Sequence, residues 1–521
     1  MSVRISSFSG EIPRVDARLL GNSNAQHARA VKLEDGTLAP LRAKQLVETL
    51  PAPAQTIYLN GDDWLSWALP VNVAPAPIAA NRLYITGDGA PKILANGDTY
   101  ALAVPAPLAA PAVSLVSGTP DPDLSSTILY CYTWVTAFDE ESEPSVLSNA
   151  LLWSPGHQVN VTGFSAVPAG RAINRMRIYR SQTSALGETI LYLIHERAAA
   201  PGDFLDDVDA NPIEEQLPSV DYNPPPAGLT GLVAMPNGMM AAFVGKSLYF
   251  CEPYRPHAWP EKYILSADYE IVGLGVFGSS LAVMTTGQPY IVSGTAPDTM
   301  SMEKLELSLP CVAARGIVDL GFSVAYPSPD GLVVISSSGA QLVSRNLITR
   351  DQWQRLVPSS FVAGLFSGRY LASYDADGDV AIIVIDLTGE QPFITRSPEY
   401  ADAMFTSIET GALYLLQGDD IYEWDAISAA PGSFLWRSKK FVQAAEINFG
   451  AFLVEGVPAA GAPALSVKIL ADGVQRATVQ TMNSVVRLPG GFLARTWEIE
   501  IESNCQVTAL ALGFSPTDLA G

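Results

Sequence analysis

The stretch IVGLGVFGSS, Ile271 to Ser280, poses the first question about the fold. Its glycines 273, 275 and 278 have the Gly-x-Gly-x-x-Gly spacing that cradles a pyrophosphate in dinucleotide-binding folds, and Asp298 lies twenty residues past the last of them. That fingerprint has physical meaning only where a helix follows, because the helix N-terminus supplies the amide donors and the positive dipole that hold the phosphates.

The residues that follow this stretch contain no helix start. The segment LAVMTTGQPYIVSG has an apolar run from 281 to 284, a turn signal at Gly287-Gln288 and a second β-rich run from 290 to 292. This order is typical of a β-hairpin. The stretch therefore favours a β fold over a nucleotide-binding fold, and its glycines need another explanation.

The composition agrees with a mostly β protein that has several cores. The chain has 521 residues, of which 48% are hydrophobic, and its 41 Gly and 39 Pro supply turns at a density that suits many short strands. The four cysteines are far apart and form no Cys-x-x-Cys pair, so buried free thiols are favoured over disulfides.

One unit recurs along the chain. It is an apolar segment, a turn with glycine, and a short run with an aromatic or β-branched centre. The turn glycines are Gly245, Gly287, Gly331, Gly378 and Gly418, at separations of 42, 44, 47 and 40 residues. This period is typical of the four-stranded blades of a β-propeller.

The long interval before the first of these units has a content of its own. A further unit with Gly87-Asp88-Gly89 lies 158 residues upstream of Gly245, and the residues between them alternate as strands, as in ILYCYTWVTAFDEESEPS. Such a segment resembles a fibronectin type III-like β-sandwich inserted into the propeller. After Asp425 the rhythm changes to about six alternating strands, including a hairpin turn at Asp472-Gly473, which indicates a separate C-terminal sandwich.

The predicted architecture is therefore all-β, with a propeller of about six blades, an inserted fibronectin type III-like sandwich and a C-terminal β-sandwich. The first 50 residues show no clear period apart from a possible helix near AKQLVETL. The predicted boundaries are 1–50 for an N-terminal arm, 51–105 for the first part of the propeller, 106–224 for the inserted sandwich, 225–428 for the rest of the propeller and 429–521 for the C-terminal sandwich.

The charge of the chain is strongly negative and uneven. The formal net charge is −22, yet residues 1–50 hold 7 Lys and Arg against 5 Asp and Glu. An acidic surface repels nucleic acid phosphates, so recognition of DNA or RNA by a basic face is not expected, whereas passage of DNA without adhesion is compatible with it.

A search for catalytic and metal-binding patterns predicts no enzyme, no cofactor and no metal. Carboxylates are abundant but stand in no recognisable catalytic context, and Asp330-Gly331 is better explained as hairpin turn chemistry. A calcium loop from Asp375 would need glycine and glutamate where Val380 and Asp386 stand. The crowded corner CEPYRPHAWPEKY favours a rigid connection anchored by Trp259 over a ligand platform.

The chain shows no membrane or export signal. The start MSVRISSFSGEIPRV lacks the apolar core of a signal peptide, and no run of 18 apolar residues occurs. We therefore expect synthesis in a cytoplasm and no stable membrane insertion.

The opening FSGEIPRVDARLLGNSNAQHARAVKLEDGTLAPLR, residues 8 to 42, resembles the N-terminus of phage tail tubular protein B, the tail nozzle family of short-tailed double-stranded DNA phages. The shared features are a Gly/Pro stretch, a segment rich in Asn, Gln and Ala, and a Leu-x-x-Gly-x-Leu-x-Pro phrase, here Leu33, Gly36, Leu38 and Pro40. The segments FCEPYRPHAWPEKY, PYIVSGTAPDTMS and YPSPDGLVVIS also look similar to those of phage virion proteins.

This resemblance implies a structural protein of a virion tail, made in the host cytoplasm. It implies a homo-oligomeric, hexameric ring below the portal and the head–tail adaptor, with tail fibres or tailspikes as neighbours. The ring would conduct and retain packaged double-stranded DNA without binding it specifically. The less acidic arm, with Arg14, Arg18, Arg29 and Lys32, would then contact the next subunit or the adaptor.

Two other function classes stay open at this point. One is a tail-associated or secreted protein whose sandwich modules bind a cell-surface glycan. The other is a propeller glycoside hydrolase, which would need a close pair of carboxylates in a central pocket.

Overall fold

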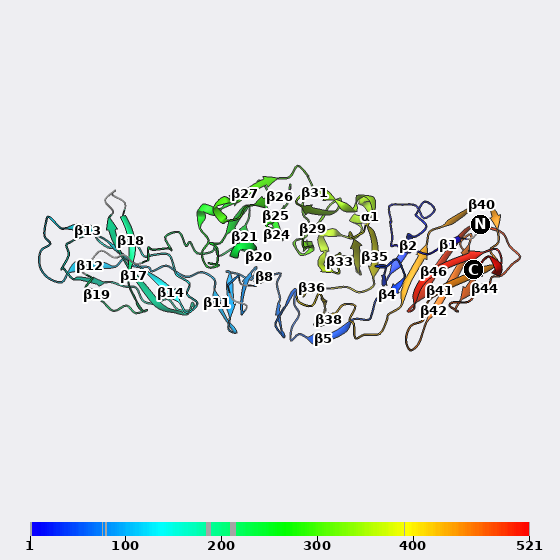
Figure 1. The fold of residues 1–521 in the computed structure, drawn as a ribbon, viewed down its shortest axis with the longest axis horizontal. Helices are drawn as coiled ribbons and strands as arrows, with labels where there is room; N and C mark the ends of the chain where they lie inside the picture. Colours follow the sequence, from blue (N-terminus) through cyan, green and yellow to red (C-terminus); the bar gives the residue numbers. More distant parts are fainter. Residues whose placement is uncertain are drawn as a thin grey trace.

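The computed structural model describes residues 3–75, 77–78, 81–183, 189–208, 215–389 and 391–519. Within these ranges the chain is nearly all β, as predicted, and its one α-helix is α1 (Arg350–Gln354). None of the helices in these ranges is long and apolar enough to cross a membrane. Figure 1 shows an elongated body with three regions along its long axis, and both ends of the chain lie in the same region.

The middle region, here called the central sheets, consists of consecutive four-stranded antiparallel arrays. The first array consists of β8 (Asn72–Pro75), β9 (Arg82–Thr86), β10 (Lys92–Ala95) and β11 (Asp98–Ala101), and the second of β20 (Thr230–Ala234), β21 (Met240–Val244), β22 (Ser247–Phe250) and β23 (Leu265–Ser266). The third consists of β24 (Ile271–Phe277), β25 (Ser280–Thr285), β26 (Tyr290–Ser293) and β27 (Ser301–Lys304). The fourth consists of β28 (Val318–Asp319), β29 (Ser323–Ser328), β30 (Gly331–Ser336) and β31 (Gly339–Leu342).

Two further arrays complete the central sheets. They are β32 (Val362–Phe366), β33 (Arg369–Ala376), β34 (Asp379–Asp386) and β35 (Phe393–Ser397); and β36 (Ala403–Thr406), β37 (Leu413–Gln417) and β38 (Asp420–Glu423) with β5 (Gln45–Thr49) from the N-terminal segment. A separate hairpin, β6 (Thr56–Asn60) and β7 (Asp63–Trp67), packs beside β36.

The repeated unit of the sequence is the middle hairpin of five of these arrays. Each of the five turn glycines lies at the turn between the second and third strands, which confirms the predicted hairpins. Gly245 and Gly418 have φ angles of 58° and 62°, a left-handed conformation that glycine adopts at no steric cost. The left-handed backbone conformation thus explains why glycine stands at these two positions.

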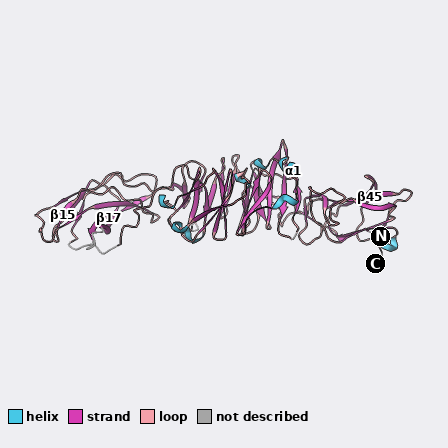
Figure 2. Cartoon of the chain, turned by 90° about the horizontal axis from the view of Figure 1, so that it is seen from above, coloured by secondary structure: helices cyan, strands magenta, loops and turns pink. Residues whose placement is uncertain are grey.

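The apolar cores lie between neighbouring arrays and not inside any one of them. A separate buried cluster lies between each pair of successive arrays, from β8–β11 and β20–β23 through to β32–β35 and β36–β38. A further cluster lies between β36–β38 and the β6–β7 hairpin. The first strand of each array also packs against the first strand of the next. Figure 2 shows many strands side by side along the middle of the molecule.

The glycines of the Ile271–Ser280 stretch are explained by this packing. A Cβ on Gly273 would lie 2.4 Å from Ile317 Cδ1, and one on Gly275 would lie 2.5 Å from Val324 Cγ1, so both glycines let β24 approach the next array closely. Gly278 is the β24–β25 turn residue, with φ of 57°. The hairpin prediction is confirmed, because β25 pairs antiparallel with β26.

The N-terminal segment supplies strands to the sheets of other regions. Strand β1 (Val3–Ile5) pairs with β46 (Gln506–Gly513), and β2 (Ala25–Arg29) lies between β35 and β39 (Phe434–Ser438). The short strands β3 (Val31–Lys32) and β4 (Ala39–Pro40) form a hairpin. The helix considered near AKQLVETL was wrong: these residues form β5, because pairing with the free edge of β38 outweighs their helix propensity.

At one end of the body lie the distal sheets, residues 112 to 206. Their strands are β12 (Ala112–Leu115), β16 (Val159–Thr162) and β19 (Phe204–Asp206); β13 (Ser126–Ile128) and β15 (Leu151–Trp153); and β14 (Tyr130–Thr136), β17 (Ile173–Thr183) and β18 (Thr189–Ala198). Tyr130, Tyr132, Trp134 and Trp153 pack in a shared core.

An extended segment, residues 142 to 148, forms hydrogen bonds along the outer edge of β14. Three serines spaced three residues apart each donate their backbone N–H to a β14 carbonyl, and each hydroxyl accepts the backbone N–H of the same β14 residue. The pairs are Ser142 with Trp134, Ser145 with Tyr132, and Ser148 with Tyr130, at 2.8–3.2 Å. The groups of an edge strand that would otherwise recruit another strand are thereby satisfied.

The other end holds the terminal sheets, residues 434 to 513 together with β1. Their remaining strands are β40 (Phe441–Ile447), β41 (Ala451–Val457), β42 (Leu465–Ala471), β43 (Val474–Val479), β44 (Val486–Arg487) and β45 (Ala494–Ser503). The predicted Asp472-Gly473 turn joins β42 to β43. One ten-stranded sheet runs from β32 through β35, β2 and β39 to β43, so the central and terminal sheets share a continuous backbone ladder.

Candidate functional site

The four basic residues predicted to contact another protein have different environments. Arg14 Nη1 donates to the Arg345 carbonyl oxygen at 2.7 Å, and Arg18 pairs with Asp16 at 2.9 Å. Lys32 forms an ion pair with Asp425, whose side chain is buried. Three of the four basic side chains therefore form a hydrogen bond or an ion pair with another residue of the same chain.

Arg29 differs from the other three. It is exposed at the end of β2, and no hydrogen bond or ion pair of its side chain is found within the described residues. Arg29 lines a pocket of about 490 Å³ together with residues of β34 and β35.

One arginine side chain joins three separate segments of the central sheets. Arg315, in the 3₁₀ helix η4 (Ala314–Gly316), donates from Nη2 to the carbonyl oxygens of Gln55, at 2.7 Å, and Asp402. Cavities of about 610 and 300 Å³ lie beside it, and both are lined by Gln55, Arg315 and Val362. Segments far apart in the sequence therefore meet at this point.

The acidic turns considered in the sequence have structural partners. The carboxylate of Asp330 pairs with Arg350 at 2.7 Å, and Asp375 Oδ1 accepts the backbone N–H of Gly378 at 2.8 Å. Across the described parts of the chain no three His, Cys, Asp or Glu side chains gather as a metal site would require. The cysteines are all buried and free, as predicted.

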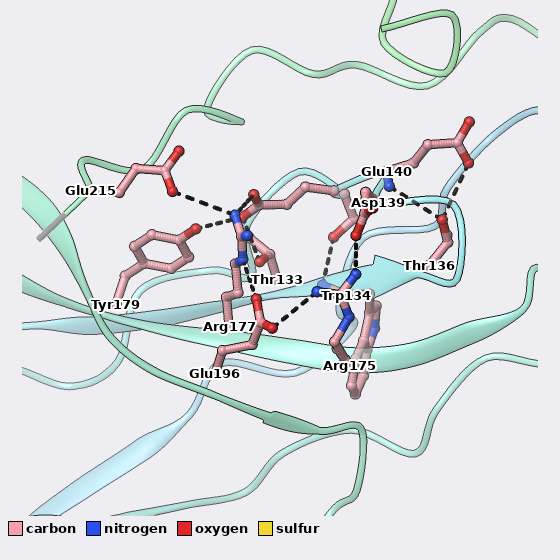
Figure 3. A network of polar contacts seen from close by, with 12 residues as sticks. Thr133, Trp134, Thr136, Asp139, Glu140, Arg175, Arg177, Tyr179, Glu196 and Glu215 are labelled. Carbon is pink, nitrogen blue, oxygen red and sulfur yellow. Dashed lines mark hydrogen bonds and ion pairs between the residues drawn. The ribbon is translucent and has the colours of Figure 1, made fainter. Parts of the chain in front are cut away.

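A network of polar side chains lies on the outer face of β14, β17 and β18 (Figure 3). Residues of β17 alternate between the two faces, so Met176 and Ile178 enter the core while Arg175 and Arg177 face outward. The register places Arg177 opposite Glu196 of β18, and its Nε donates to that carboxylate at 2.7 Å. Arg175 donates to Glu196 at 3.0 Å and also pairs with Asp139.

Glu141 joins this face to the strands below it. Its Oε1 accepts hydrogen bonds from Thr133 Oγ1 and Tyr179 Oη, both at 2.7 Å, and its Oε2 accepts one from Arg177 Nη1 at 3.0 Å. Burial and the Glu141 charge together raise the pKa of Tyr179 well above its ordinary value, so the phenol keeps its proton and serves as a donor.

The neighbouring residue Glu140 turns toward the central sheets and forms the charged joint, defined here as Glu140, Arg171 and His257. Arg171 Nη2 donates to Glu140 Oε2 at 2.5 Å and to the Leu102 carbonyl oxygen at 3.3 Å. His257 lies 4.0 Å from Glu140, measured from Nδ1 to Oε1. The three side chains are 3%, 1% and 1% exposed, so water is excluded from the ion pair.

The carbonyl oxygen of Glu141 determines which nitrogen of His257 carries hydrogen. His257 Nε2 lies 3.0 Å from that oxygen, and a carbonyl can only accept, so Nε2 is the donor and Nδ1 is bare in the neutral ring. Burial, with a contribution from Arg171, lowers the pKa of His257 to about 3. Burial raises the pKa of Glu140, against the opposing charges of Arg171 and Arg82.

An aromatic contact lies beside the charged joint. Phe138, on the same turn as Glu140, packs edge-on against Tyr100 of β11 with ring centroids 5.4 Å apart, and the Arg82 guanidinium lies 5.0 Å from its ring centre. The joint is therefore a contact of fixed geometry between the distal and central sheets. It positions one region against the other.

Sequence reasoning found part of this site. It placed Trp259 as the packed anchor of its corner, and Trp259 is indeed buried, with Nε1 donating to the Pro256 carbonyl oxygen at 2.8 Å. It did not identify His257, Glu140 or Arg171 as partners. His257 is 86 residues from Arg171 and 117 from Glu140, and no local pattern marks such long-range pairing.

Comparison with known proteins gives no family. No family model and no curated protein matches the chain. Solved structures that resemble it in part are BBS1N in its complex with ARL6DN (10% identity, TM-score 0.30, covering 75% of this chain and 97% of that one), the extracellular domain of BT4673 from B. thetaiotaomicron (8%, 0.22, 93% and 61%) and PorZ of Porphyromonas gingivalis (11%, 0.23, 86% and 52%). Likenesses of this strength carry no argument about function.

Proposed function

We propose that the chain is a non-enzymatic structural protein of a phage tail. In this proposal several copies, expected to be six, form a ring or nozzle below the portal and the adaptor, with tail fibres or tailspikes as further neighbours. The ring conducts and retains packaged double-stranded DNA, and the protein resides in the virion after synthesis in the host cytoplasm.

The observation that carries the proposal is the continuity of the chain's sheets. Residues from the first 50 positions enter sheets of the central and terminal regions through β1, β2 and β5. A ten-stranded sheet spans both regions, and the charged joint fixes the distal sheets to β11 and its surroundings. A wall that retains packaged DNA needs this kind of resistance to deformation, whereas catalysis does not require it.

The fold proposed for the central sheets is a β-propeller of six blades. Six four-stranded arrays follow one another, buried apolar clusters lie between neighbours, and Arg315 links the segments of residues 55 and 402. The distal and terminal sheets are interpreted as the inserted fibronectin type III-like sandwich and the C-terminal sandwich. On this interpretation residues 51–105 and 225–428 form the propeller, and β5 of the N-terminal segment adds the fourth strand of its last blade.

The position of Arg315 bears on where DNA would pass. The first strands of successive arrays pack against one another, and the cavities beside Arg315, of about 610 and 300 Å³, are far smaller than a passage for a duplex would be. A duplex therefore cannot thread one chain, and the proposed channel lies between subunits. The net charge of −22 suits such a channel wall, because phosphate neutralisation by basic groups would hold the DNA back.

Two solution measurements test this proposal together. Light scattering of the purified chain, alone and with the adaptor, should give a mass of several chains. A filter-retention assay should show no stable complex with duplex DNA even at low salt, where basic contacts are strongest.

A chain that stays monomeric in the presence of the adaptor would contradict the ring. A chain that binds a polysaccharide with measurable affinity would favour the glycan-binding alternative. Polysaccharide cleavage that is lost on an Asp→Asn change near Arg315 would favour the hydrolase.

A further inference from the structure

The pocket beside Arg29 contains an unusual arrangement of positive charge. Strands β2 and β35 lie parallel, and their register places Arg29 opposite Arg396. His27 precedes Arg29 by two residues on β2, and both are exposed while Ala28 between them is buried, so both face the same side. All three side chains line the pocket of about 490 Å³.

Within the described residues, only Arg396 of the two arginines has a counterion. Arg396 Nε donates to Glu11 Oε2 at 3.1 Å, and Glu11 Oε1 accepts the backbone N–H of Ala28 at 2.9 Å. The Glu11 side chain is 5% exposed, and both of its oxygens are occupied. Glu11 thus fixes the Arg396 guanidinium, and no ion pair between Glu11 and Arg29 is found among the described residues.

The guanidinium of Arg29 therefore keeps unused donors in the pocket. The formal charges of the lining balance, Glu11 and Asp379 against Arg29 and Arg396, but Glu11 is paired with Arg396 and no ion pair joins Asp379 to Arg29 among the described residues. Arg29 lies beside a second cation on the neighbouring strand, so an external anion at Arg29 would be favourable. A guanidinium matches a carboxylate or phosphate with two parallel hydrogen bonds.

We propose that this pocket, the Arg29–Arg396 pocket, binds a carboxylate side chain presented by a second copy of the chain. The occupant follows from the composition: 53 Asp and Glu stand against 31 Lys and Arg, so a neighbouring copy presents an acidic surface. The choice of a second copy rests on the proposed ring. One carboxylate in each such pocket offsets part of the repulsion between subunits that each carry −22.

The first test measures the pocket without any assembly. Calorimetric titration of the full chain at low salt uses a blocked tetraglutamate peptide in one series and inorganic phosphate in another. The proposal expects peptide binding that weakens about tenfold or more in Arg29→Gln, because charge-assisted hydrogen bonds are lost. The matched control is Arg476→Gln, an exposed arginine of β43 outside the pocket, whose guanidinium lies 4.4 Å from the Phe492 ring centre, and its peptide affinity should equal that of the unchanged chain.

Two results of this titration would overturn the assignment. One is peptide affinity that does not differ between the unchanged chain and Arg29→Gln, including absence of binding in both. The other is phosphate binding without peptide binding, which would show that the occupant is not a carboxylate. Arg29 is exposed and makes no side-chain hydrogen bond among the described residues, so the variant is expected to fold.

The second test concerns the source of the carboxylate. Where the unchanged chain assembles with its tail neighbours, Arg29→Gln should lower the assembled fraction and Arg476→Gln should not. An assembled fraction equal in both variants would overturn the role of a second copy. Failure of the unchanged chain to assemble would contradict the proposed ring, while the peptide titration would still decide whether the pocket binds a carboxylate.

Discussion

The residues of the charged joint depend on one another, because each is buried where it has few alternatives to its present partners. Glu140 and Arg171 are both held by the distal sheets and are covered by Leu102 and His257 of the central sheets. Burial removes the water that would otherwise solvate either charge. The pair therefore stabilises the joint only as a pair.

The first prediction is that Arg171→Met loosens the joint, whereas the double change with Glu140→Leu does not. The single change leaves a buried carboxylate without its counterion, at a cost of about 3–5 kcal/mol, while two apolar side chains of similar volume are close to neutral. Hydrogen exchange of the backbone N–H groups in the turn 136–141 should accelerate by about a hundredfold or more in the single variant.

Exchange in the cores of β14 and β17 is the internal control and should change little, because their apolar cluster does not include the joint. Unchanged exchange at the turn in Arg171→Met would contradict the importance of the ion pair.

A second prediction concerns pH and His257. The folded joint lowers the pKa of His257 from 6.5 to about 3, so its contribution to stability is complete above pH 6.5 and decreases as the pH falls below that value. The decrease is up to about 1.4 kcal/mol per pH unit. Charged and titratable groups around the ring are Arg82, Glu140, Arg171, Arg255, Tyr84 and Tyr222.

His257→Gln isolates this effect, because glutamine keeps an amide donor for the Glu141 carbonyl oxygen but does not titrate. The difference in unfolding free energy between the unchanged chain and the variant should fall by about 1 kcal/mol between pH 6.5 and pH 5.5. The raised pKa of Glu140 acts in the opposite direction in both proteins, so the difference between them removes most of it. A difference that is constant with pH would contradict the assignment of a neutral His257.

At the scale of elements, Gly273 and Gly275 allow β24 to pack closely against the next array. Gly275→Ala should lower stability by about 1–3 kcal/mol, because the added methyl would lie 2.5 Å from Val324, which is fully buried. Gly278→Asn is the matched control in the same motif: this glycine has open space around it and a left-handed φ that asparagine tolerates. Urea unfolding midpoints measure both, and equal effects of the two changes would contradict the packing explanation.

The N-terminal segment is an element of the fold and not a separate arm. Removal of residues 1–42 takes away β1 and β2 and uncovers a core in which Ile5, Phe8 and Ala28 pack with Trp436. We expect the terminal sheets of the truncated chain to be cleaved rapidly by protease. If they stay as resistant as in the full chain, the segment is dispensable for folding, and the same truncation then becomes a clean test of assembly.

Elements that form hairpins were predictable from the sequence, because their signals are local. Gly245 and Gly418 mark turns by their conformation, and the apolar runs beside them mark strands. The strand β5 was not predictable, because it pairs with β38 at a separation of about 370 residues. The same limit applies to the joint, whose residues are brought together by the fold, and to Arg29, whose neighbour Arg396 is defined only by the register of β2 on β35.

At the scale of the whole molecule, the sheets form an elongated body with its two chain ends in one region (Figure 1). The ten-stranded sheet and the charged joint connect the three regions by hydrogen bonds and buried contacts, so the regions are expected to move together. In the proposed ring, each such body is one segment of the wall. The DNA channel is then a property of the assembly, because the first strands of successive arrays pack against one another within each chain.

The image of the assembly viewed along its axis tests this account most directly. Negative-stain electron microscopy of the chain with its neighbouring tail proteins should show a closed ring of several elongated subunits around one axial hole that is wide enough for duplex DNA. The interior of each subunit should show no such hole. Isolated single chains in the presence of the same tail proteins, or a duplex-sized hole within a single chain, would contradict it.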